Sequence, residues 1–157
     1  MDSAVHGTVA GVVRDVVAVH APEELVVVEG LAALGGRAVA RRLRGSGARR
    51  EALGFGLADV AVLVTPVVWL VLNEVAQRAA GAAVNRAERG FGALWRRVFQ
   101  RGTGQVVVPP LSKEQLGEVR RRLLEVAAER GLTEAKAVAV ADAVVTRLAL
   151  DQSAAEG

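Results

Sequence analysis

Asp59 is the residue of this chain whose surroundings best suit chemistry. It lies in an almost continuously apolar stretch, residues 55–72, which reads FGLADVAVLVTPVVWLVL. Burial among apolar side chains raises the pKa of a carboxylic acid, so a buried Asp59 is a candidate site for a proton or a cation. The simpler interpretation is a residue in the first turns of a helix, where the helix dipole or Arg50 stabilises its charge. Asn73 shares a helix face with Asp59 and is the second candidate for a buried polar residue.

The other residues that could carry enzyme chemistry do not form a recognisable site. The chain has no cysteine, and its two histidines, His6 and His20, lie too far apart on one expected helix to bind a metal together. Neither a phosphate-binding loop nor a dinucleotide-binding fingerprint occurs, and the serines and threonines show no spacing typical of a catalytic triad. We therefore expect a protein without enzymatic activity, metal or cofactor.

The apolar stretch has two interpretations. It is about long enough to cross the hydrocarbon of a bilayer, for which a helix needs roughly 20 apolar residues. Pro66 in its middle and Asp59 near its start weaken this membrane interpretation, because proline kinks a helix and a charge is costly in lipid. The alternative is a core helix of a soluble bundle, hydrophobic nearly all round. The side chains that would meet lipid or core are Leu63, Val67, Val68, Trp69, Leu70 and Leu72.

An arginine cluster precedes the apolar stretch, between residues 37 and 50. Basic residues beside an apolar segment hold that end on the cytoplasmic side and attract anionic lipid. The alternatives are a solvated loop and, less favoured, a nucleic-acid contact, because the cluster lacks side chains that stack on or read bases. The residues of this basic anchor are Arg41, Arg42, Arg44, Arg49 and Arg50.

Helices are expected throughout residues 1–101. Ser3 can cap a helix that ends near His20, and Pro22 suits the first turn of a second helix that runs to about Leu43. Beyond the apolar stretch the helical pattern continues to the end of this region. Its aromatic residues and arginines are typical of a helix that lies on a membrane surface or packs on a core.

Residues 102–111 predict a break between helical regions, because they contain two glycines followed by Pro109 and Pro110. We interpret them as a hinge or linker. The alternative is a lone edge strand, residues 105–108, offered to the sheet of a partner.

Residues 112–150 predict an amphipathic helical hairpin. Ser112 and Gln115 have the spacing of a capping box. Gly131 suits the left-handed position after the first helix, and Thr133 can cap the second. We expect the hairpin to dock a protein partner through its apolar stripe, and the tail, residues 151–157, to be disordered. The stripe comprises Leu116, Val119, Leu123, Val138 and Val145.

The hairpin has the turn spacing of a helix-turn-helix, but Glu134 and Asp142 on its second helix would repel the phosphates of DNA. Nucleic acid is therefore an unlikely partner, and a DNA-binding regulator is our third hypothesis. Arginine far outnumbers lysine, which is typical of a bacterium with a GC-rich genome. The net charge of the 157-residue chain is only +3, so its basic character is local.

The sequence thus predicts an all-α protein, a helical bundle with a long central apolar helix and a C-terminal helical hairpin. The leading functional hypothesis is a non-enzymatic, membrane-associated accessory protein that docks a protein partner. The alternative is a soluble helical adaptor or dimerisation module whose apolar helix forms the core, and a homo-oligomer is compatible with it. No signal peptide is recognisable at the start of the chain, so we expect the cytoplasmic side of the cell membrane, or the cytoplasm.

Overall fold

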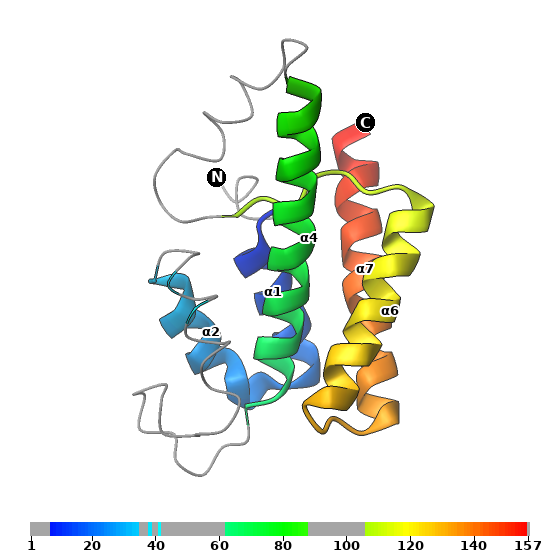
Figure 1. Cartoon of the computed structure of the whole chain (residues 1–157). Coiled ribbons are helices and arrows are strands. Elements are labelled where there is room, and N and C mark those ends of the chain that lie inside the picture. The colour runs from blue at the N-terminus through cyan, green and yellow to red at the C-terminus, as the bar shows by residue number, and fades with distance from the viewer. Residues whose placement is uncertain (1–6, 35–37, 39–40, 42–61, 88–105, 157) are drawn as a thin grey trace.

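A computed structural model describes residues 7–34, 38, 41, 62–87 and 106–156 of the chain (Figure 1). The described residues confirm the all-α prediction. The elements are α1 (Val9–His20), a short 3₁₀ helix η2 (Pro22–Glu24), α2 (Leu25–Ala32), α4 (Val64–Ala87), α6 (Lys113–Glu129) and α7 (Glu134–Glu156).

Four of these helices form a bundle in which each packs against two neighbours. Helix α1 lies between α4 and α7, and α6 completes the ring by packing on α4 and α7 (Figure 1). Helix α2 folds back on α1 through the corner made by η2. Valine supplies most of the core: Val9, Val12, Val13, Val16 and Val17 of α1 and Val140 and Val144 of α7 are at most 3% exposed.

Helix α4 contains residues 64–72 of the apolar stretch and contributes them to the core of this bundle. Val64, Val67, Val68, Val71 and Leu72 are at most 2% exposed, because other helices of the same chain cover them. The expectation that these five side chains meet lipid is therefore wrong, because helices of this chain cover them; Leu70, between them, is half-buried. Among the residues described, none of the helices combines the length and the apolar character needed to cross a bilayer. Residues 55–61 of the stretch lie outside the described part of the chain.

The position of Pro66 also differs from the expectation. The helix begins at Val64, so Pro66 is its third residue instead of lying in the middle of a longer helix. A proline in the first turn removes no intrahelical hydrogen bond, because the first N–H groups of a helix have no partner within it. Pro66 therefore starts α4 without interrupting it.

The N-terminal helix begins later than predicted. Thr8 is its cap, and the Thr8 hydroxyl accepts a hydrogen bond of 3.1 Å from the Gly11 N–H. Ser3, the cap chosen from the sequence, lies outside the described residues. Threonine and serine both cap helices through their hydroxyl groups. The sequence does not show that Thr8 also pairs with Val107, in the segment that precedes α6.

That segment was predicted to be a hinge. The structure instead places residues 106–111 on the bundle. The Val9 N–H donates to the Val106 carbonyl and the Val108 N–H donates to the Gly7 carbonyl, each at 2.8 Å, around an antiparallel bridge between Thr8 and Val107. We call residues 106–111 the strap, because they tie the start of α1 to the start of α6 (Figure 1). Residues 106–108 therefore pair with residues 7–9 of this chain, so the alternative of an edge strand offered to the sheet of a partner is wrong.

The C-terminal hairpin follows the predicted local signals. The Ser112 hydroxyl accepts from the Gln115 N–H at 3.2 Å, and the Gln115 side chain accepts from the Ser112 N–H at 2.8 Å, which confirms the capping box. The Thr133 hydroxyl accepts from the Lys136 N–H at 3.3 Å and caps α7.

Gly131 ends α6 in the left-handed conformation, with φ of 85°. Its N–H donates to the Ala128 carbonyl at 3.2 Å and the Leu132 N–H donates to the Ala127 carbonyl at 2.9 Å. This pair of hydrogen bonds is a Schellman motif.

The tail differs from the prediction of disorder, because α7 continues through Asp151 to Glu156. Asp151 accepts a hydrogen bond from Arg147, one turn earlier. The Gln152 amide, oriented to satisfy both of its polar atoms, donates to the Leu111 carbonyl at 2.9 Å and accepts from the Leu111 N–H at 2.8 Å. The last turns of α7 are therefore held by the strap.

The first prediction concerns Gly131→Ala. Nothing lies within 4 Å of a Cβ atom added there, so the only cost is backbone strain at positive φ. We expect a loss of about 1 kcal/mol in the free energy of unfolding. Urea denaturation followed by circular dichroism measures it. The control is Gly117→Ala, at an equally open helical position in α6, where alanine should stabilise; equal effects of the two variants would contradict the prediction.

Candidate functional site

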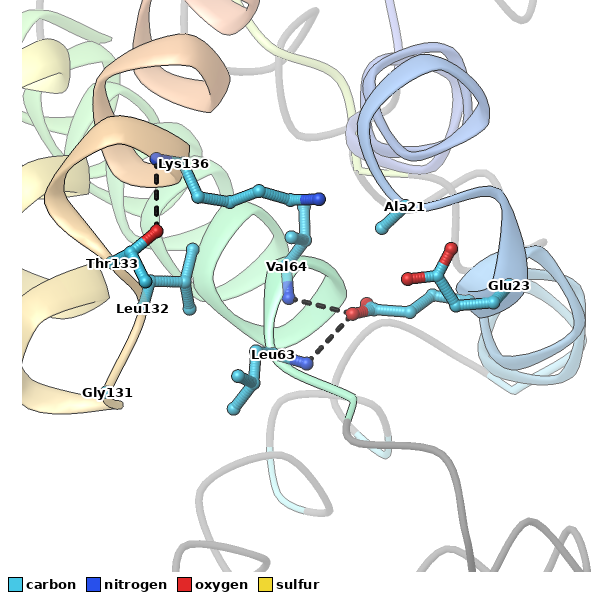
Figure 2. A pocket seen from close by; sticks show the side chains of 9 residues that line it. Ala21, Glu23, Leu63, Val64, Gly131, Leu132, Thr133 and Lys136 are labelled. Atoms are coloured by element: carbon cyan, nitrogen blue, oxygen red, sulfur yellow. Dashed lines mark hydrogen bonds between the residues drawn. The ribbon is translucent and has the colours of Figure 1, made fainter.

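Glu24 joins the α1–η2 corner to the start of α4. One of its carboxylate oxygens accepts from the Leu63 N–H at 2.9 Å and from the Val64 N–H at 3.1 Å, the two hydrogen bonds drawn from these residues in Figure 2. The other oxygen accepts from the Thr65 N–H at 2.7 Å. The next residue, Pro66, has no N–H. A single carboxylate, 2% exposed, therefore satisfies the free backbone donors at the N-terminus of α4 and complements its positive dipole end.

The corner itself explains why Glu24 points inward. Pro22 begins η2, and the Glu24 N–H closes the tight turn by donating to the Ala21 carbonyl at 2.8 Å. This turn leaves Glu23 exposed and Glu24 buried. The sequence indicates only that both glutamates favour the first turn of their own helix. One feature of the sequence could have indicated that a distant residue caps α4: Leu63, the residue before α4, has no side chain able to cap a helix.

A cleft of about 230 Å³ opens beside this carboxylate, between the α1–η2 corner and the turn from α6 to α7 (Figure 2). The Lys136 ammonium, on one wall, donates to the His20 carbonyl at the C-terminus of α1. Glu23, on the other wall, is exposed. The residues lining the cleft are Ala21, Glu23, Glu24, Leu63, Val64, Gly131, Leu132, Thr133 and Lys136.

The chemistry of the cleft is limited. Its volume is below the roughly 300–1,000 Å³ typical of small-molecule sites. It offers one exposed carboxylate, and an ammonium that is already hydrogen-bonded to a main-chain carbonyl. Within the described ranges, no cluster of three or more histidine, cysteine or acidic side chains is placed to hold a metal.

Ion pairs link most of the neighbouring helices. Arg147 of α7 is the most buried of the cations involved. Burial lowers the pKa of its guanidinium group, but the hydrogen bonds that it donates to Asp151 and Asp15 raise this pKa by more. The pKa of Arg147 is therefore raised overall. Such pairs add little stability at the surface and mainly fix which helix lies beside which. The interhelical pairs are Arg14–Glu29 (3.6 Å), Asp15–Arg147 (2.8 Å), Glu74–Arg122 (3.4 Å) and Arg120–Asp142 (2.8 Å).

The two helices of the hairpin present different outer surfaces. On α6, Arg121 pairs with Glu118 at 2.6 Å and with Glu125 at 2.9 Å, and the hydrogen bond to Glu118 is the main cause of its raised pKa. On α7, exposed uncharged residues lie along one side of the helix, and the exposed Asp142, which pairs with Arg120, interrupts them between Ala139 and Thr146. We call the uncharged residues the α7 outer face: Ala135, Ala139, Thr146, Leu150 and Ser153.

The exposed large apolar side chains of the described residues are Val19, Val26 and Leu150, at 75%, 58% and 61% exposure. They belong to α1, α2 and α7. Val19 follows Asp15 by one turn on the same face of α1. Because Asp15 is paired with Arg147, Val19 lies on the side of α1 that meets α7.

The predicted docking stripe is used by the bundle itself. Val119 and Leu123 are 2% and 1% exposed and belong to the core, so a partner cannot reach them. Leu116, Val138 and Val145 are half-buried. The stripe is apolar because α6 packs on α4 and α7 packs on α1.

The remaining predicted site residues divide into two groups. Asn73 is 3% exposed and is buried as expected, and Trp69 is 5% exposed, while Leu63 and Leu70 are half-buried. Arg41 is exposed. Asp59 and the other members of the basic anchor, Arg42, Arg44, Arg49 and Arg50, lie outside the described residues.

Comparison of the chain with protein-family models, with curated proteins and with solved structures found no match. The geometry of the described helices is therefore the basis for a functional proposal.

Proposed function

We propose that this protein is a non-enzymatic helical adaptor that binds a protein partner through the outer surface of its bundle. The burial of the apolar side chains of α4 carries the proposal. Val67, Val68 and Leu72 are at most 1% exposed in the single chain, so the most apolar part of the sequence serves its own core. Contact with a partner is left to the exposed faces of the other helices.

The α7 outer face is the part of the hairpin best suited to docking. The central part of a protein interface is depleted in charged residues, because charges must lose water when they are covered. The end of this face around Leu150 meets this requirement, because the exposed residues Thr146 and Ser153 beside it are uncharged. Val19 adds an exposed valine on the neighbouring helix. The α6 surface does not meet it, since covering Arg121 would desolvate its pairs with Glu118 and Glu125.

The second prediction tests this surface in cells. A photoreactive phenylalanine analogue at Leu150 or at Val19 should cross-link the full chain to the same protein. The analogue at Arg121 should not, because it lies on the charged surface of α6. All three sites are exposed, so the substitution leaves the core intact.

Leu150→Arg supplies the matched loss-of-function test. It should keep the helical circular dichroism spectrum and reduce the cross-link from Val19. Equal cross-linking from all three sites, or an unchanged Val19 cross-link in Leu150→Arg, would reject the α7 outer face as the docking surface.

A second candidate function is contact with an anionic membrane surface by the basic anchor, and the distribution of charge favours it. The described residues contain 11 lysines and arginines and 13 aspartates and glutamates, a net charge of −2. The whole chain has a net charge of +3, so the rest of the sequence carries +5. Segments with several arginines bind anionic lipid mainly by electrostatic attraction.

The third prediction follows from this charge distribution. The full chain should float with vesicles that contain phosphatidylserine, remain unbound with vesicles of phosphatidylcholine alone, and be released by high salt. Replacing Arg42, Arg44, Arg49 and Arg50 with glutamine should abolish flotation. Binding that survives high salt, or survives these replacements, would contradict an electrostatic contact through the basic anchor.

A further inference from the structure

We draw no further inference here: the strongest candidate, the cleft between the α1–η2 corner and the α6–α7 turn with Glu23 and Lys136 on its walls, carries none because nothing in the structure shows what covers it.

Discussion

Replacing Glu24 with alanine should destabilise the protein by about 3–5 kcal/mol, because three backbone N–H groups at the start of α4 lose their acceptor together. A buried donor without a partner costs about 1–3 kcal/mol. The loss also removes the negative charge that complements the N-terminal end of the helix dipole. Urea unfolding of the full chain, followed by circular dichroism, gives the free energy directly.

Two further variants separate this effect from a general effect of charge. Glu23→Ala removes the same charge from the exposed neighbour and should change stability by about 0.5 kcal/mol or less. Glu24→Gln keeps one acceptor oxygen, but it turns an amide NH₂ towards backbone donors, so its stability should lie between those of Glu24→Ala and the unsubstituted protein. Hydrogen exchange at residues 63–65 should quicken in both Glu24 variants. Equal stability of Glu23→Ala and Glu24→Ala would show that the carboxylate does not hold α4.

Val67→Arg should abolish cooperative folding, because it places a charge where the native side chain is 1% exposed. An unpaired charge in a protein core costs several kcal/mol, which is comparable with the total stability of a small domain. Thermal unfolding followed by circular dichroism should lose its sigmoidal transition. The control is Gln77→Arg, at an exposed position on α4, which should unfold like the unsubstituted protein.

The same variant distinguishes the two interpretations of the apolar stretch. If α4 were a lipid anchor, Val67→Arg would leave a folded protein that is released from the membrane fraction. If α4 is a core helix, the variant loses its fold wherever the protein is located. A folded Val67→Arg protein, released from membranes, would overturn the packing described for α4.

The hairpin was predictable because its signals are local. Ser112 and Gln115 cap α6 across three residues, and Gly131 supplies a conformation that other residues adopt only with strain. Thr133 begins α7 in the same way. Signals of this kind depend only on neighbours in the sequence, so they act in the same way whatever the tertiary packing around them.

The features missed from the sequence depend on distant partners. Hydrophobicity shows that α4 must avoid water, but it does not show whether lipid or protein covers it. The contact of Glu24 with Thr65 spans 41 residues, and no periodicity in the sequence connects the two. The strap was interpreted as a linker because the sequence near Val106 and Val108 offers no second strand for them to pair with. Their backbone hydrogen-bond partners are Val9 and Gly7, about 100 residues earlier in the chain.

The ion pair between Asp15 and Arg147 joins residues 132 positions apart. During translation, α1 is therefore made long before α7 leaves the ribosome, and its valines have no complete core to enter until α7 has been synthesised. Domains that depend on such non-local contacts fold slowly and expose apolar surface while they wait. The nascent chain of this protein should consequently be a substrate for the chaperones that bind apolar segments near the ribosomal exit.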